Sequence, residues 1–296
     1  MGKASRRHRG TDRTPRAARP QPAPFEARPF AGLPHETDWV AMREILPAAT
    51  AVVTVRPEHV PDGAPSEVTV ATVLPLAWPA LHRTDGTVLI GTQSGNSSGD
   101  ASRDLAAQLL AGLAAEQGHP VTTTPQVTAD SPRLQDVLAA DSGFDVVVHE
   151  GFDFWVEDQE LEGEARESLE RANESIVPTV PMAALPSAYW VRIGDRAHVR
   201  LVLPDDEDVA TDALARLHAA GEDGLGDGTR LLGAFRAGGL LVPVWDLDPE
   251  LGAADHEDAL AAFGERYRAA LGADAPLTAE ERRARSGLLS RQVTLR

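Results

Sequence analysis

The segment from Gly91 to Asp100 holds the residue types best suited to chemistry, in the order GTQSGNSSGD. Glycines let successive backbone N–H groups converge, and a helix N-terminus favours negative charge, so we expect an anion- or nucleotide-binding loop here. Its candidate ligand residues are Ser94, Gly95, Asn96, Ser97, Ser98 and Gly99. A Walker-type triphosphatase needs a lysine after the last glycine, and the only lysine of the chain is Lys3, so that class is excluded.

The same loop also matches the G-x-S-x-G pattern of a serine hydrolase. Ser97 is the central serine, and Asp246 and His256 follow it in the serine, acid, histidine order of that class. In such enzymes the serine stands directly at the end of a strand in a parallel sheet, whereas Ser97 lies beyond the predicted strand. Anion binding therefore fits the loop better than hydrolysis, an ordinary capped loop is the simplest alternative, and no catalytic residue is assigned.

No metal ion or cofactor is predicted. The chain has no cysteine, and His149-Glu150 lacks the second histidine that a zinc-binding helix would supply four residues later. The absence of cysteine also excludes disulfides and cysteine nucleophiles, and we expect a cytoplasmic protein. No stretch of the sequence is long and apolar enough to cross a membrane, so a membrane partner is not expected.

Charge divides the chain into two parts. Residues 1 to 28 hold eight basic and two acidic side chains, a net +6, which leaves −23 on residues 29 to 296 to give the total of −17. A segment rich in Arg and Pro with few apolar residues cannot offset the entropy lost on ordering. We therefore expect residues 1 to 28 to form a disordered basic tail on an acidic body.

A basic tail of this kind can contact nucleic-acid phosphates without reading sequence. The partner would be nucleic acid or a ribosome, and the contacting residues would be Lys3, Arg6, Arg7, Arg9 and Arg13. Two alternatives stay open: the tail only aids solubility, or it docks on the acidic segment 150 to 174 of the same chain. A protein partner of the body is a further alternative, and the sequence predicts no oligomeric state.

Apolar periodicity predicts short strands joined mainly by hairpins. In the first half we expect helices at 36 to 46 and 101 to 117, and strands at 51 to 56, 67 to 74, 87 to 92, 144 to 149 and 152 to 156. The acidic segment 150 to 174 should be largely a solvated helix. In the second half we expect hairpins at 189 to 203 and 231 to 247, and helices at 209 to 220, 260 to 271 and 278 to 291.

The hairpin at 189 to 203 can be given a register from its alternation. A three-residue loop would put both of its apolar sets on one face, and these sets are Tyr189, Val191, Ile193, Val199, Leu201 and Leu203. Trp190 would then lie opposite Arg200 on the other face. In so acidic a body, that face is a candidate anion or nucleotide platform, unless it is a plain solvent face or is covered by a helix.

Because hairpins dominate over strand-helix-strand units, we predict an α+β fold of mostly antiparallel hairpins packed with helices. The predicted organisation is a disordered basic tail at 1 to 28, an N-terminal lobe at 29 to 177 and a C-terminal lobe of similar size at 178 to 296. Pro178, Pro181 and Pro186 mark the linker between the lobes.

Four runs of the body resemble an actinobacterial family with a domain of unknown function. They are ETDWVAMREI at 36 to 45, TVLPLAWPAL at 72 to 81, SSGDASRD at 97 to 104 and GLLVPVWDL at 239 to 247. The resemblance spans nearly the whole body and implies a bacterial cytoplasmic protein with no known activity. Members are sometimes labelled as a preprotein translocase motor subunit, but that motor needs a P-loop lysine, which this chain lacks.

The leading functional interpretation is thus a non-enzymatic binding or regulatory protein whose basic tail contacts a polyanion. The alternative is an enzyme, or an anion- or nucleotide-binding protein, centred on the loop at 91 to 100.

Overall fold

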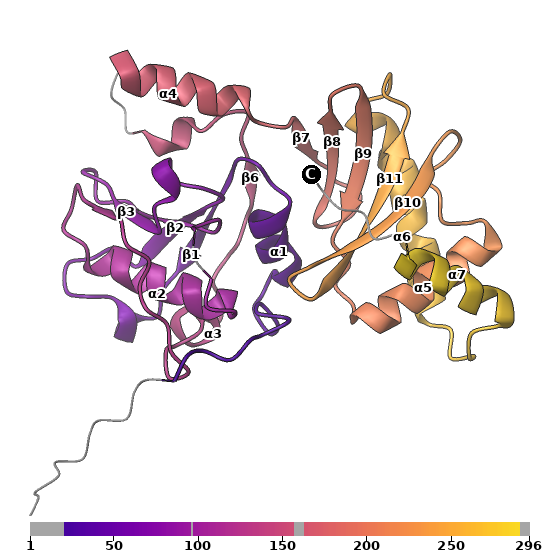
Figure 1. Cartoon of the computed structure of the whole chain (residues 1–296), viewed down its shortest axis with the longest axis horizontal. Helices are drawn as coiled ribbons and strands as arrows, with labels where there is room; N and C mark the ends of the chain where they lie inside the picture. Colours follow the sequence, from indigo (N-terminus) through magenta and orange to yellow (C-terminus); the bar gives the residue numbers. More distant parts are fainter. Residues whose placement is uncertain (1–20, 96, 157–162, 291–296) are drawn as a thin grey trace, which may run out of the picture.

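The computed structural model describes residues 21–95, 97–156 and 163–290 (Figure 1). These residues form two β-sheets, each packed against helices, and most neighbouring strands are antiparallel. The predicted α+β class is confirmed. In the same part of the chain, no helix is both long and apolar enough to cross a membrane.

The sheet of the N-terminal lobe has the strand order β5-β3-β4-β2-β1-β6. Its strands are β1 (Ala49–Thr54), β2 (Glu67–Ala71), β3 (Ala80–His82), β4 (Val88–Gly91), β5 (Pro120–Val121) and β6 (Val147–Val148). β1 and β2 form the predicted antiparallel pair, whereas β2 and β4 run parallel. The predicted hairpin is confirmed, and one crossover interrupts the hairpin pattern.

The helices that accompany this sheet include α1 (Glu36–Glu44), α2 (Ala101–Ala114) and the short α3 (Leu134–Val137). α2 buries Leu105 and Leu109, as its periodicity predicts. Gly112 lets α2 lie close to the sheet, because a Cβ there would stand 3.0 Å from both Ala80 Cβ and Val88 Cγ1. The C-terminal end of α2 is therefore packed closely against β3 and β4.

The sheet of the C-terminal lobe is antiparallel throughout, in the order β10-β11-β9-β8-β7. Its strands are β7 (Thr179–Pro181), β8 (Ala188–Ile193), β9 (Arg196–Leu201), β10 (Arg230–Ala237) and β11 (Leu240–Leu247). The helices α5 (Glu207–Ala220), α6 (Glu257–Leu271) and α7 (Ala279–Ser290) complete this lobe. Asp206 caps α5, because its side chain accepts from the backbone N–H of Asp208 at 3.0 Å.

One hydrophobic core cluster contains residues of both lobes, and a second lies within the C-terminal lobe. One face of the C-terminal sheet packs on its own helices through residues such as Trp245 and Leu260. The other face joins the core of the N-terminal lobe through residues such as Tyr189 and Val242. Because both faces are covered, this sheet carries apolar residues on both sides.

That double burial explains why the predicted register of the β8–β9 hairpin is wrong. A two-residue turn of Gly194 and Asp195 joins the strands, so that Arg200 pairs with Tyr189 and not with Trp190. Gly194 has φ 60, as the first central residue of a type II′ turn requires. Since alternation cannot tell one buried face from another, it could not set the register. The predicted platform of Trp190 opposite Arg200 does not exist.

The strands predicted at 144 to 149 and 152 to 156 are also largely wrong. The first is reduced to β6, and the second is a short 3-10 helix, η3 (Asp153–Trp155). Phe152 and Trp155 stack with ring centroids 4.3 Å apart, and Trp155 Nε1 donates to the Val73 carbonyl oxygen at 2.8 Å. The aromatic side chains of this segment therefore pack together in a small cluster apart from the main core, and they do not form a strand.

The exposed helix α4 (Gly163–Glu174) confirms part of the predicted acidic helix, while residues 157–162 lie outside the described residues. Residues 1–20 of the predicted tail also lie outside them. The end of that predicted segment is placed against the body. Arg28 Nε contacts Glu36 Oε1 at 2.6 Å, and Arg28 Nη2 donates to the Pro204 carbonyl oxygen at 2.9 Å, so Arg28 connects the two lobes.

Candidate functional site

The Gly/Ser loop joins β4 to α2 as predicted, and its polar groups bind the chain itself. Asp100 caps α2 by accepting from the backbone N–H groups of Ser102 and Arg103. Asp104 accepts from Ser98 N at 3.0 Å. These are the N–H groups that an anion would need. Two carboxylates of the chain therefore already occupy the N-terminus of α2.

Other members of the loop are also engaged. The side chains of Ser94 and Gln108 are hydrogen-bonded at 2.7 Å, and Ser97 Oγ accepts from Gly99 N at 3.2 Å. Asn96 lies outside the described residues. The anion-binding hypothesis for this loop stays a prediction, and an anion would have to compete with Asp100 and Asp104.

The structure does not bring the hydrolase candidates together. Ser97 lies in the N-terminal lobe, whereas Asp246 and His256 belong to the C-terminal lobe. Asp246 faces His198 Nε2 at 3.7 Å and Arg230 Nη2 at 3.6 Å. His256 is buried, and its Nε2 atom has no partner within the described ranges. No hydrogen bond or ion pair between described residues links any two of the three.

A site that the sequence did not signal lies at the boundary between the lobes. Residues 182–187 connect β7 to β8 and separate two cavities, and we call this segment the strap. The Glu257 carboxylate accepts from the backbone N–H groups of Ala183 and Ala184, both at 2.8 Å. At Gly264, a Cβ would stand 2.7 Å from Leu185 Cδ2, so the glycine lets α6 lie against the strap.

The first cavity, the apolar cleft, has a volume of about 360 Å³ and lies between the strap, α6 and the end of β9. Its walls are mainly apolar, and include Leu185, Leu201, Leu203, Phe263 and Leu271. Tyr267 Oη donates to Asp205 Oδ2 at 2.9 Å within the cleft. Burial, together with the neighbouring Asp205 carboxylate, raises the pKa of Tyr267. The cleft thus combines an apolar body with the Tyr267–Asp205 pair, and Thr37 and Arg268 also line it.

The second cavity, the polar cavity, has a volume of about 300 Å³ on the other side of the strap. It is lined by His35 and Asp38 of α1 and its cap, by Asp145, and by Ser187 and Tyr189. Ser187 Oγ donates to Asp38 Oδ1 at 2.6 Å. Burial raises the pKa of Asp38 most strongly, and the charge of Asp145 adds to the effect. The cavity therefore holds a partly desolvated carboxylate.

Two non-glycine residues at the polar cavity adopt left-handed backbone conformations. His35 has φ 59 and Ser187 has φ 53. Such conformations cost roughly 1–2 kcal/mol each for residues with a side chain, and often occur at functional sites. Ser187 is buried, and its Oγ also lies 2.7 Å from Thr37 Oγ1. The strained backbone at Ser187 thus brings a hydroxyl from the C-terminal lobe to α1 of the N-terminal lobe.

No sequence motif could have revealed this site. Its residues come from segments 35–38, 144–146 and 181–189, which only the packing of the lobes brings together. The prolines of the third segment were interpreted as a linker. Within the described ranges, no group of three or more histidine or acidic residues is placed to hold a metal ion.

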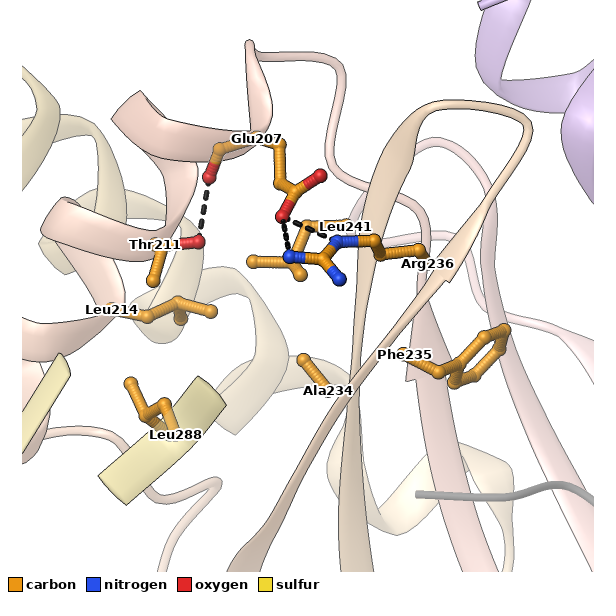
Figure 2. A pocket seen from close by; sticks show the side chains of 8 residues that line it. All are labelled: Glu207, Thr211, Leu214, Ala234, Phe235, Arg236, Leu241 and Leu288. Atoms are coloured by element: carbon orange, nitrogen blue, oxygen red, sulfur yellow. Dashed lines mark hydrogen bonds and ion pairs between the residues drawn. The ribbon is translucent and has the colours of Figure 1, made fainter. Parts of the chain in front are cut away.

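A third hollow, between α5, β10 and α7, carries no comparable site (Figure 2). Its volume of about 20 Å³ has room for about one water molecule. Figure 2 shows the Glu207 and Arg236 side chains paired across it, with Leu214, Ala234 and Leu288 beneath. Hydrogen bonding to Glu207 raises the pKa of Arg236. This pair covers apolar side chains and leaves no space for a larger ligand.

Comparison of the sequence with models of known protein families identifies the family of this chain. The sequence model described as "Family of unknown function (DUF5926)" matches residues 29–296. The chain belongs to this family. The predicted membership of a family with a domain of unknown function is therefore confirmed, and the match begins at the predicted end of the tail. Searches of the curated proteins and of the solved structures returned no match.

Proposed function

We propose that this chain is a non-enzymatic binding protein that takes up a small, mostly apolar molecule in the apolar cleft. The observation that carries the proposal is the size and lining of this cleft. Its volume of about 360 Å³ is within the range of small-molecule pockets, roughly 300–1,000 Å³, and its walls are mainly apolar with a few convergent polar groups.

The polar pair in the cleft indicates which ligands fit. Asp205 accepts from Tyr267 through Oδ2, and its Oδ1 atom accepts no hydrogen bond from any residue that the structure describes. A ligand with a hydroxyl or amino donor could bond to Oδ1 while its apolar part contacts Leu203 and Leu271. We therefore propose an apolar alcohol or amine as the ligand class.

A ligand-observed NMR screen with small apolar alcohols and amines tests this proposal. The Leu271→Trp variant should fill the cleft and abolish binding, because the larger side chain takes the ligand's place. Leu251→Trp is the matched control, since Leu251 is exposed and does not line the cleft. The proposal fails if the unmodified protein binds no member of the set, or if Leu271→Trp binds them equally well.

The enzymatic alternative remains testable in the same preparation. A serine hydrolase centred on the loop would hydrolyse activated esters and lose that activity in Ser97→Ala. We expect no such activity, because Ser97, Asp246 and His256 are not brought together.

We further propose that the basic tail contacts nucleic acid, as free RNA or on the ribosome, in the cytoplasm. The charge difference supports this, because a body at −23 would repel a polyanion that a tail at +6 attracts. Since Arg28 contacts Glu36 and Pro204, the appropriate deletion is residues 1–20 and not 1–28. The deleted protein should lose salt-sensitive RNA binding, and equal binding at low salt would refute this proposal.

A further inference from the structure

The polar cavity is lined by the carboxylates of Asp38 and Asp145, and no arginine or lysine in the described part of the chain lines it. Asp38 is partly buried, and the charge of Asp145, which also lines the cavity, contributes to raising the pKa of Asp38. Its nearest basic group is His35, whose Nδ1 atom lies 3.7 Å from Asp38 Oδ2 and whose side chain is 45% exposed. In the described ranges, no arginine or lysine pairs with Asp38. A carboxylate in this position gains from a positively charged partner.

Tyr189 provides the second, independent observation. The residue is only 3% exposed and lines the same cavity. Its hydroxyl has no hydrogen-bond partner among the residues that the structure describes. Burial, and to a smaller extent the charge of Asp38, raises the pKa of Tyr189. Because Tyr189 lines the cavity, a ligand bound there can act as the partner of this hydroxyl.

The chemistry of these groups selects among ligands. An anion would be repelled by Asp38 and Asp145, and a neutral alcohol would leave the carboxylate uncompensated. A primary ammonium carries a positive charge and three N–H donors, which suit a carboxylate and a hydroxyl oxygen together. Phe144, whose ring stacks on Trp39 with centroids 4.0 Å apart, adds an apolar part to the cavity wall.

We propose that the polar cavity binds the primary ammonium group of a small aliphatic amine between the Asp38 carboxylate and the Tyr189 hydroxyl. Ser187 holds the carboxylate in place through its 2.6 Å hydrogen bond. The ammonium group donates to a carboxylate oxygen of Asp38 and to the hydroxyl oxygen of Tyr189. This site is separate from the apolar cleft, because the strap lies between the two cavities.

Titration of the full chain with n-butylammonium chloride, followed by NMR, tests the proposal. Sodium chloride at matched ionic strength controls for screening, and tetramethylammonium controls for charge without N–H donors. The unmodified protein should show saturable binding of n-butylammonium and weaker binding of tetramethylammonium. Asp38→Asn should weaken binding at least about tenfold, as expected for the loss of a charged hydrogen bond, and Asp62→Asn, at an exposed position, should not change it.

Tyr189→Phe provides a second variant that keeps the shape of the core, and it should weaken binding several-fold. Binding should also decline as the pH falls through the raised pKa of Asp38, with His35, Asp145 and Tyr189 as the other titratable groups that line the cavity. Leu271→Trp should leave ammonium binding unchanged, so failure of the apolar cleft and failure of this site can be distinguished. The proposal is overturned if the unmodified protein shows no saturable binding, or if both Asp38→Asn and Tyr189→Phe bind as well as it does.

Discussion

The Gly/Ser loop and the polar cavity contain similar residue types but differ in how their polar groups are satisfied. In the loop, the carboxylates of Asp100 and Asp104 accept from the N–H groups at the start of α2. In the polar cavity, the Tyr189 hydroxyl has no partner among the described residues, and the Asp38 carboxylate has no cation closer than His35. A cluster of glycine and serine thus marks a loop that stabilises itself, whereas unsatisfied groups mark the better candidate for a ligand.

The largest expected effect is on the free energy of unfolding, and it concerns Asp100 in the Gly/Ser loop. Asp100 is almost fully buried, caps α2 and lies 3.1 Å from Arg103 Nε and 3.5 Å from Arg133 Nε. Asp100→Ala should lower the free energy of unfolding by about 3 kcal/mol, because it removes the cap and takes a buried carboxylate away from Arg103 and Arg133. Urea denaturation measures this loss. If it is no larger than for Asp130→Ala, at an exposed position, the loop is not self-stabilising.

The next prediction extends the comparison to Arg200, which is only 8% exposed. It forms no ion pair in the described part of the chain, its Nε atom is buried without a partner, and burial lowers its pKa. Arg200→Met should raise the free energy of unfolding by about 1–2 kcal/mol, because an uncompensated charge leaves the interior. Arg103→Met is the contrasting control and should destabilise the fold, since Arg103 pairs with Asp100. Equal destabilisation by both would mean that Arg200 has a partner after all.

The third prediction concerns pH and the polar cavity. Because the folded state raises the pKa of Asp38 above its ordinary value of 3.8, this group favours folding when protonated. That contribution is fully present below the ordinary pKa and is lost as the pH rises through the raised value. Asp38→Asn removes the contribution, so the unmodified protein should lose stability relative to the variant on going from about pH 4 to neutral pH. Thermal unfolding of both proteins across this range measures the difference. If the melting temperatures of the two proteins change in parallel with pH, the account is contradicted.

The smallest expected effect is that of Tyr189→Phe on stability. Its hydroxyl has no partner among the described residues, so removal should change the free energy of unfolding by less than about 0.5 kcal/mol. The matched control is Tyr267→Phe, which loses the hydrogen bond to Asp205 and should cost about 1 kcal/mol. Urea denaturation of both variants makes the comparison. A loss for Tyr189→Phe as large as for Tyr267→Phe would show that the cavity hydroxyl is already bonded.

Local signals in the sequence were sufficient to predict several structural elements. The β1–β2 hairpin, the apolar stripe of α2 and the capping box that begins α7 all follow from neighbouring residues. In that box, Thr278 N donates to Glu281 Oε2 at 2.6 Å, and Glu281 N donates to Thr278 Oγ1 at 3.2 Å. Such features depend on a few consecutive residues, so they can be predicted without the tertiary fold.

The features that were missed depend on contacts between distant segments. The β8–β9 register could not be predicted because the N-terminal lobe buries the second face of the sheet. The polar cavity needs α1 and the strap to meet, and nothing in the sequence around His35 and Ser187 indicates their left-handed backbones. The prolines at 181 and 186 resemble a linker in sequence, yet Pro181 directly precedes the strap that separates the two cavities, and Pro186 lies within it.

A crystal of the full chain soaked in n-butylammonium phosphate would test the central claim most directly, because it offers a cation to the polar cavity and an anion to the loop at once. The account predicts electron density for the ammonium group between Asp38 and Tyr189, and none for phosphate at the N-terminus of α2. Phosphate bound to the N–H groups of Ser98 and Gly99, with the polar cavity empty, would contradict it.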